Sequence, residues 1–333
     1  MNNILIFNLV ITLKMLVNIM EIYIIWILAF ILTLLLTTIF TVLFTKIKGN
    51  LYENVRGGIP RGVGLAPYLV MVLLFPQPYR YLIAIIGLMA FIDDVIGRRK
   101  ITAYLEIGQL LRGLGILIVM LGGYYIFGPV AILVALMVQI FNIADMEPGT
   151  AGIVVIIMSF VSFVILALLN SSSYYMAVLL LVICLGYISQ DYSGYIMMGE
   201  VGNHSFAVAL GICLASVSSV IAKLLAPQHF YLVEFIVMLC LFLITAMIIA
   251  KLRTQTLTYY LERYLHIQNP TFGDFVMDVL TGGGLGDLCR KLILEDRQIT
   301  VNNPTLIKLG ARRLVYNPVK ALPSNEGNTL SKN

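Results

Sequence analysis

Long apolar runs separated by short polar connections fill the first 250 residues of the chain. A run of about 17 to 25 apolar residues is long enough to cross the hydrocarbon core of a bilayer as a helix. We predict nine spans, near residues 22–44, 63–79, 81–97, 102–122, 127–145, 150–169, 174–190, 203–226 and 231–250. The pattern therefore predicts an all-α fold, a polytopic transmembrane helical bundle of about nine or ten spans.

The two ends of the chain depart from this pattern. Residues 1–20 are apolar but interrupted by Lys14 and Asn18, so they read as an extra span, a signal-like segment or the product of an early start codon before Met20. Residues 251–333 are more polar and are predicted to form a cytoplasmic tail. We therefore divide the chain into an uncertain N-terminal segment (1–20), a transmembrane domain (21–250) and the tail (251–333).

Composition supports a membrane protein. Hydrophobic residues make up 60% of the chain and charged residues only 12%, and the mean hydropathy is +0.94. The net charge of +5 comes from lysines and arginines in particular loops, which speaks for membrane topology and an anionic membrane surface rather than for nucleic acid. None of the four cysteines forms a CxxC pair, so the sequence implies neither a disulfide framework nor a zinc site.

The positive loops predict the orientation of the spans. They lie between the first and second predicted spans, between the third and fourth, and after the last. Cytoplasmic loops of membrane proteins carry such an excess of positive residues. Counting spans from these loops places every unusual polar segment at the cytoplasmic face. The positive residues are Lys46, Lys48, Arg56, Arg61, Arg98, Arg99, Lys100, Lys251, Arg253 and Arg263.

Two of the polar segments lie in the first hundred residues of the chain. Asp93 and Asp94 close a predicted span, and charge so near hydrocarbon costs several kcal/mol per residue. Such a pair could hold Mg²⁺ against a phosphate or carry a proton, or it could be a solvated span terminus. The Gly57–Gly64 stretch would let the backbone approach an anion, with Arg61 supplying charge, or it is a flexible loop.

Two further polar segments follow later spans. Asn142 and Asp145 are three positions apart and so share one side of a helix end. The alternative is an ordinary capped turn. In the segment Met198–Asn203, Glu200 is framed by glycines at the start of a span, where it could bind a metal or merely offset the helix dipole.

Together these segments resemble the polyprenyl-phosphate N-acetylhexosamine-1-phosphate transferases, glycosyltransferase family 4 in the broad sense. The resemblance is carried by four motifs in family order, "IPRGVG", "GLMAFIDDVIG", "FNIADMEPG" and "MMGEVGN", within residues 21 to 250. Three positions depart from the family pattern. Glu200 replaces its third aspartate, Val63 separates the glycines of its first motif, and Thr150 stands where a basic residue is usual.

The resemblance implies a reaction and a site. A phospho-N-acetylhexosamine would pass from a UDP-sugar to a polyprenyl phosphate at the cytoplasmic face of the cell membrane, giving polyprenyl-diphospho-sugar and UMP. Mg²⁺ would be the cofactor, with Glu200 and Asp94 as its ligands. Asp93 and Asp94 would be catalytic and handle the lipid phosphate. Substrate contacts are expected from Arg61, Asn142, Asp145 and Asn203.

Alternatives from other classes stay open. A catalytically silent homologue could keep the fold as a membrane scaffold, and the Glu200 substitution favours that reading. A transporter or lipid flippase would instead relay protons through intramembrane carboxylates, but its charges should lie mid-span rather than at span ends. The sequence leaves open the sugar, the polyprenol, the pathway, and whether the protein is a homodimer.

Overall fold

The computed structural model describes residues 2–55, 57–97, 107–282, 284–295 and 297–316. The chain divides into two compact units, Met1–Thr245 and Ala246–Asn333. The division falls inside one helix, close to the predicted boundary at residue 250. Residues 98–100 of the predicted positive loops and residues 317–333 of the predicted tail lie outside the described part.

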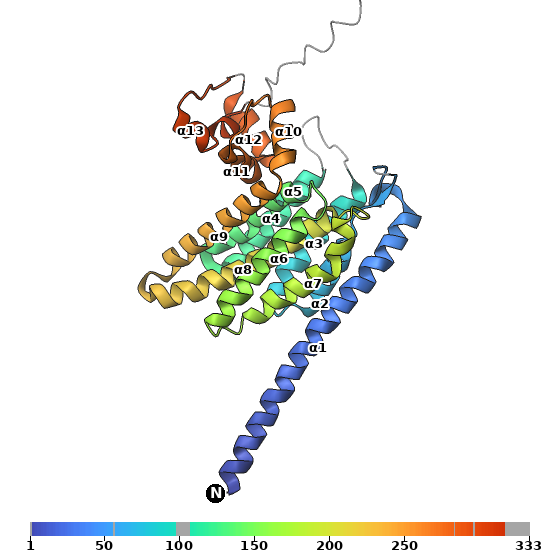
Figure 1. Ribbon diagram of the computed structural model, residues 1–333, viewed down its shortest axis with the longest axis vertical. Coiled ribbons are helices and arrows are strands. Elements are labelled where there is room, and N and C mark those ends of the chain that lie inside the picture. Colours follow the sequence, from blue (N-terminus) through green and yellow to red (C-terminus); the bar gives the residue numbers. More distant parts are fainter. Residues whose placement is uncertain (1, 56, 98–106, 283, 296, 317–333) are drawn as a thin grey trace, which may run out of the picture. The chain divides into compact units, whose positions relative to one another are not determined.

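The residues of the first unit that the structure describes are mostly helical, with one short strand pair (Figure 1). The all-α helical bundle predicted from the apolar runs is confirmed. Each predicted span coincides with one helix, although the bounds differ by several residues. The helices are α1 (Asn2–Ile47), α2 (Leu65–Leu74), α3 (Tyr79–Ile96), α4 (Ile107–Phe127), α5 (Ala131–Ala144), α6 (Thr150–Leu168), α7 (Tyr174–Tyr192), α8 (Gly199–Leu225) and α9 (Phe230–Leu252).

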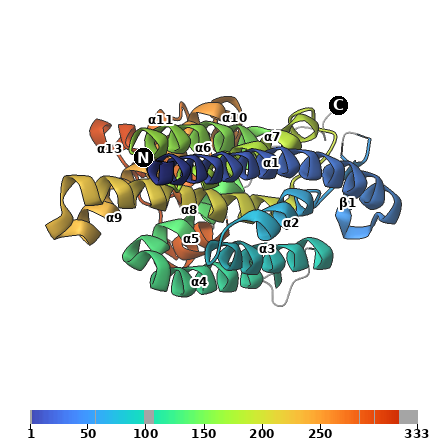
Figure 2. The same cartoon turned by 90° about the horizontal axis from the view of Figure 1, so that it is seen from below.

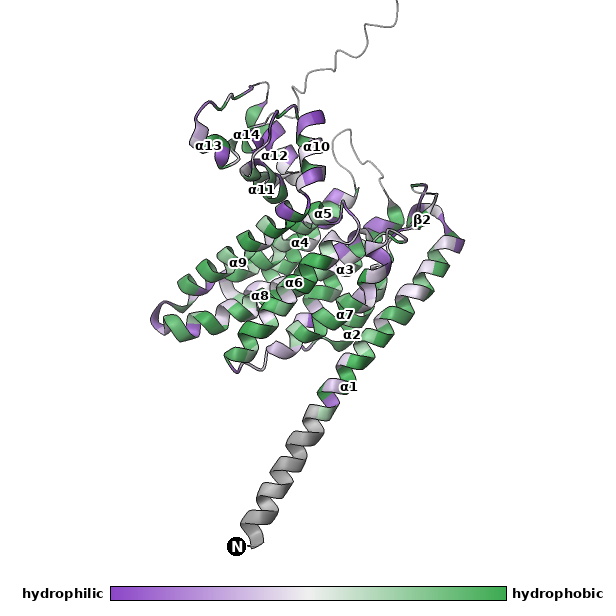
Figure 3. Cartoon of the chain, in the orientation of Figure 1, coloured by the Kyte–Doolittle hydropathy of each residue, from purple (hydrophilic) through white to green (hydrophobic). Residues whose placement is uncertain are grey.

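Six segments of the described chain are long and apolar enough to cross a membrane, as expected of a multi-pass membrane protein. One of them, Ile107–Ala144, holds both α4 and α5, which a short 3-10 turn at Gly128–Val130 separates. The ten residues of α2 are too few for a full span, so the prediction of a span at 63–79 was too long. Figure 3 shows the hydrophobic character of these helices along their length.

Helix α8 forms the core of the bundle. It packs against α2, α3, α5, α6 and α7, and in Figure 2 it lies between the α1–α6 and α3–α4 sides. Nearly every side chain from Val201 to Ser218 is buried. Because α8 is surrounded, its first turn is held by several neighbours at once, and that turn carries the Glu200 segment.

A small hairpin joins α1 to α2. Strands β1 (Tyr52–Glu53) and β2 (Ile59–Pro60) pair antiparallel, with Tyr52 opposite Pro60. Gly58 has a φ of +105°. A Cβ atom there would collide with the Tyr52 hydroxyl group, so the turn needs glycine. The glycine-rich stretch is thus part of a defined hairpin that delivers Arg61, and it is not an open loop.

In its described part, the second unit contains five short helices after the end of α9. They surround a small core of Leu257, Leu261, Phe275 and Val279. Thr271 and Asp274 form a reciprocal capping box that begins α11. The helices are α10 (Thr254–Arg263), α11 (Phe272–Thr281), α12 (Gly284–Leu294), α13 (Pro304–Lys308) and α14 (Ala311–Leu314).

Candidate functional site

Four of the predicted polar segments meet at one end of the first unit. A cleft of about 610 Å³ lies where the hairpin, the end of α5 and the start of α8 come together. It contains Arg61, Asn142, Asp145, Glu200 and Asn203, five of the seven residues predicted for the site. The other lining residues are Gly49, Asn50, Tyr52, Glu53, Val55, Gly97, Met146, Met197 and Gly199.

Asp94 lies just beneath this cleft and caps α8. Its side chain is fully buried. One carboxylate oxygen accepts from the Glu200 backbone N–H at 3.1 Å and the other from the Val201 N–H at 2.9 Å. Two amides at a helix N-terminus thereby gain the anionic partner that the helix dipole favours. Asp94, predicted as a catalytic and metal-binding residue, therefore has a structural role in this arrangement.

Glycines bring the hairpin and α8 into backbone contact. The Val63 and Gly64 N–H groups donate to the carbonyl oxygens of Met197 and Met198 at 3.2 and 2.9 Å. A Cβ atom on Gly64 would collide with the Gly202 Cα atom. The glycines of the first and fourth motifs thus serve a close approach of two chain segments.

Arg61 joins these parts electrostatically. Its Nε atom lies 3.4 Å from Asp94 Oδ1, and an Nη atom lies 3.2 Å from Glu53 Oε1. Burial alone would lower the pKa of Arg61, but Asp94, Glu200 and Glu53 raise it above its usual value. The guanidinium therefore stays charged beside the cleft.

Two amide side chains meet across the cleft. Asn203 Nδ2 donates to Asn142 Oδ1 at 2.7 Å. Among the described residues, Asn142 Nδ2 and Asn203 Oδ1 have no hydrogen-bond partner. A buried donor and a buried acceptor left unmet in this way are costly unless a ligand completes them. The pair therefore presents one donor and one acceptor side by side.

Glu200 is held by a cation from α4. Its Oε1 atom lies 2.9 Å from an Nη atom of Arg112, and Oε2 lies 3.5 Å from His204 Nδ1. The side chains of Arg112 and Glu200 are only about one-fifth exposed, at 20% and 21%. A partly buried pair of this kind holds both side chains in place more firmly than a surface pair does.

Asp145 stands among other carboxylates. It follows the last residue of α5 and lies on the wall between the cleft and a smaller cavity of about 270 Å³. Burial raises the pKa of Asp145 well above its ordinary value, and the charges of Asp191, Glu200 and Asp94 raise it further. Asp191 already has a hydrogen-bond partner, since its Oδ2 atom accepts a hydrogen bond from the Gly149 N–H at 3.1 Å. A ligand cation or hydroxyl donor would relieve this crowding of negative charge.

Asp93 points elsewhere. It is half-buried, and its carboxylate lies against Gly108 of α4. A Cβ atom on that glycine would collide with Asp93 Oδ1. It is not among the described residues that line the cleft. The structure therefore brings six of the seven predicted residues together and sets Asp93 to one side.

The predicted magnesium ligands do not fit the ion as they are arranged. Within the described residues, no three side chains of the His, Cys, Asp and Glu types are grouped so that they could hold a metal. Both Asp94 oxygens accept from backbone amides, and Glu200 is paired with Arg112. A Mg²⁺ ion is usually bound by one or two carboxylates together with waters and substrate phosphates, so Glu200 would have to leave Arg112 before it could bind the ion.

Sequence reasoning missed Arg112 and Asp191. Arg112 lies near the middle of a predicted span, and a charge at that position is a signal of function in a membrane helix. Asp191 comes just after the predicted end of another span, where it read as an ordinary terminus. Only the packing of α4 and α7 against the bundle shows that both residues belong near the cleft.

The chain was also compared with known proteins. No protein-family model matches it, and no curated protein matches its sequence.

Proposed function

We propose that this protein transfers a phospho-N-acetylhexosamine from a UDP-sugar to a polyprenyl phosphate, at the cytoplasmic face of the cell membrane. The observation that carries the proposal is the convergence of four polar segments, far apart in the sequence, on one cleft at the end of an apolar bundle. A reaction between a soluble nucleotide-sugar and a membrane lipid needs its polar groups at such a helix-end level.

The proposed reaction needs no external base. A non-bridging oxygen of the lipid phosphate attacks the β-phosphorus of the UDP-sugar. The bond from that phosphorus to the bridging oxygen breaks, and UMP leaves with the electron pair. Because a phosphate monoester is already largely ionised near neutral pH, its attacking oxygen carries no proton that must be removed. The protein's contribution is then to position the two phosphates and offset their charge.

We assign nucleotide and sugar recognition to three side chains of the cleft. The open donor of Asn142 and the open acceptor of Asn203 complement the alternating C=O and N–H groups of a uracil edge. Asp145 would accept hydrogen bonds from sugar hydroxyls. These hydrogen bonds would stabilise a carboxylate that now lies near other negative charges.

Among the described residues, Arg61 lines the cleft and Arg112 pairs with Glu200 beside it, and both would face the diphosphate. Guanidinium groups suit phosphate because their parallel N–H bonds match two of its oxygens. Asp94 and Glu200 hold these two arginines in place. The carboxylates would thus act on the phosphates through the arginines that they orient.

The two rival functions differ in what the cleft should do. A transporter or flippase should hold its charges mid-span, whereas these residues lie at the ends of α3 and α5 and the start of α8. A silent homologue is favoured by one observation, the Arg112–Glu200 pair at the position where the resemblance implies a metal ligand.

The deciding experiment uses membranes that contain the full chain. They are incubated with radiolabelled UDP-N-acetylglucosamine and polyprenyl phosphate, and the organic extract is examined for a lipid-linked product. We expect the labelled sugar to appear in a lipid from which mild acid releases it, and we expect UMP to form at the same time. If the nucleotide-sugar binds but no lipid is labelled with any UDP-N-acetylhexosamine, the protein is a silent homologue.

Asp145→Ala is expected to lower transfer at least tenfold without loss of folded protein. Hydrogen bonds to charged groups contribute about 1.5–3 kcal/mol, which corresponds to roughly 10- to 150-fold in binding. Removing a carboxylate that its neighbours repel should not destabilise the fold. Initial rates at several UDP-sugar concentrations measure the effect. Glu147→Ala, a nearby carboxylate outside the lining residues, is the control. Equal rates for both variants would remove Asp145 from the site.

The Mg²⁺ expected from the resemblance can be tested by direct binding. The Glu200 carboxylate already forms an ion pair with Arg112, so we expect the purified protein to bind Mg²⁺ weakly. The Arg112→Gln variant frees that carboxylate and should bind Mg²⁺ about tenfold more tightly. Isothermal titration measures both affinities. Arg80→Gln makes the same change at the first turn of α3 and should leave the affinity unaltered. Unchanged binding in Arg112→Gln would mean that Glu200 is not a metal ligand.

A further inference from the structure

A second and larger cavity lies at the other end of the bundle. Its volume is about 950 Å³. Tyr79 begins α3 and Lys223 lies in the last turn of α8, whereas the candidate cleft lies at the opposite ends of both helices. The cavity is therefore separate from the site of the proposed transfer, and a ligand bound there would not depend on that function.

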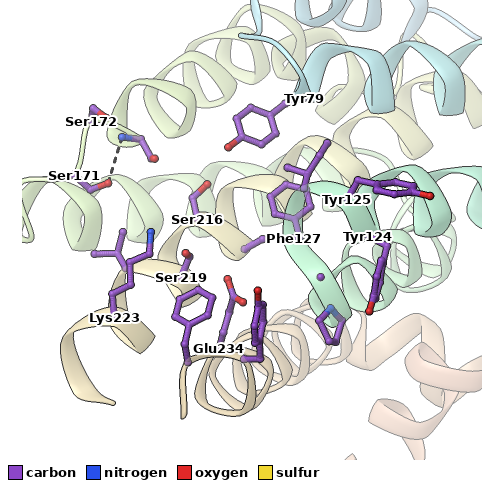
Figure 4. A pocket seen from close by; sticks show the side chains of 18 residues that line it. Tyr79, Tyr124, Tyr125, Phe127, Ser171, Ser172, Ser216, Ser219, Lys223 and Glu234 are labelled. Atoms are coloured by element: carbon purple, nitrogen blue, oxygen red, sulfur yellow. Dashed lines mark hydrogen bonds between the residues drawn. The ribbon is translucent and has the colours of Figure 1, made fainter. Parts of the chain in front are cut away.

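Aromatic rings form one part of the wall of this cavity. Tyr79 and Phe127 are stacked, with ring centroids 5.6 Å apart and planes inclined by 18°. Figure 4 shows them facing the same space as Ser216, Ser219 and Glu234. Tyr124, Tyr125, Phe230 and Tyr231 also line the cavity.

Hydroxyl groups, the buried carboxylate of Glu234 and the exposed Lys223 form the rest of the wall. Five serines line it, three of them from the connection between α6 and α7. Glu234 is only 3% exposed, although it lies within an otherwise apolar helix. It is hydrogen-bonded with Ser219 and attracted by Lys223. Carboxylates in membrane helices are costly, so one that faces a cavity has a functional use by default.

The charges of the cavity balance within the protein. Lys223 interacts with Glu234 and also lies over the Phe230 ring, 5.8 Å from its centroid. Lys223 and Glu234 are the ionic side chains among the lining residues, so their charges cancel. An anion or a cation would therefore gain little net attraction there. A neutral ligand that offers many hydroxyls and also an apolar face would gain from both kinds of wall.

We propose that this cavity binds a neutral saccharide. The C–H face of a sugar ring can pack on the stacked Tyr79 and Phe127 rings, while its hydroxyls donate to Glu234 and exchange hydrogen bonds with the serines. The volume lies within the range of about 300–1,000 Å³ typical of small-molecule sites. The saccharide is either free in solution or the headgroup of a glycolipid.

The test uses the full chain in lipid nanodiscs. In one arm, chitobiose is titrated and its binding is followed by saturation-transfer NMR. In the other, the nanodiscs contain a diglucosyl-diacylglycerol at low fraction, and native mass spectrometry measures how much of it stays bound relative to phosphatidylcholine. Binding of both probes identifies the saccharide itself as the ligand. Retention of the glycolipid alone identifies a lipid headgroup.

Three variants locate the binding. Tyr79→Ala removes half of the aromatic stack and is expected to weaken binding at least tenfold. Glu234→Gln keeps the shape of the side chain but replaces a charged acceptor, and it should weaken binding about tenfold. Tyr81→Ala makes the matched change two residues further along α3, at an exposed position that is not among the lining residues. Thermal unfolding of each variant checks the fold.

Binding of chitobiose alone identifies a free saccharide. The proposal is overturned if chitobiose does not bind the wild type and the glycolipid is retained no better than phosphatidylcholine. It is overturned equally if Tyr79→Ala and Tyr81→Ala bind the probes alike while both are folded.

Discussion

Replacing Asp94 with alanine is expected to destabilise the first unit by about 3–5 kcal/mol and to abolish transfer. The substitution leaves the buried Glu200 and Val201 amides without an acceptor and takes the buried carboxylate away from Arg61. When a buried acceptor is lost, the amide donors that remain keep their full desolvation penalty. This penalty is larger than the net contribution of the hydrogen bond to stability. Thermal unfolding of the detergent-solubilised protein, followed by circular dichroism, measures the effect.

Two further variants separate the causes. Glu53→Ala removes the other carboxylate that pairs with Arg61, but the Glu53 side chain is 42% exposed, so a loss under about 1 kcal/mol is expected. Asp94→Asn keeps the shape and one acceptor, and it should fall between the two. A stable Asp94→Ala protein that lacks only activity would instead support the catalytic role expected from the sequence.

Replacing Arg313 with alanine is expected to lower the free energy of unfolding of the second unit by about 3–5 kcal/mol. Arg313 is fully buried and bonds Asp278, and a guanidinium nitrogen lies 3.4 Å from Asp287 Oδ1. Asp278 would lose its buried counter-charge, whereas Asp287 would keep Arg290, an Nη atom of which lies 2.6 Å from Asp287 Oδ1. Hydrogen exchange on the intact chain should then show fast exchange throughout α11 and α14, while the first unit keeps its protection.

Arg297→Ala provides the comparison. Arg297 is an exposed arginine of the same unit that donates to the Ile293 carbonyl at 2.9 Å, and its removal should leave the exchange pattern of α11 and α14 unchanged. If Arg313→Ala exchanges no faster than Arg297→Ala, the buried ion pairs do not hold the second unit together.

The helical bundle could be predicted from the sequence because a bilayer leaves few choices. Backbone groups in hydrocarbon must be satisfied locally, so an apolar run of sufficient length becomes a helix whatever its neighbours are. The short helix α2 escaped this reasoning, since hydropathy alone continued the run from Leu74 through the turn around Gln77.

The meeting of the motifs could also be predicted, but the roles of their residues could not. Counting spans was enough to expect Arg61, Asn142, Asp145, Glu200 and Asn203 at one end of the bundle. The same count says nothing about distances of a few ångströms. Whether Asp94 faces a ligand or two amides depends on where α8 begins relative to α3, and that offset is fixed only by packing.

The Asp94 cap also constrains how the protein can be made. Asp94 and the Glu200 amide are 106 residues apart along the chain, so the carboxylate is synthesised well before the helix that it caps. Until α8 is in place, Asp94 at the end of α3 has Arg61 as a partner but lacks the two amides that it accepts from, and the partly inserted protein lacks both its central helix and its cleft. We therefore expect insertion of α8 to be the step that commits the chain to its folded state, and we expect products truncated after α7 to be recognised and degraded by membrane quality control.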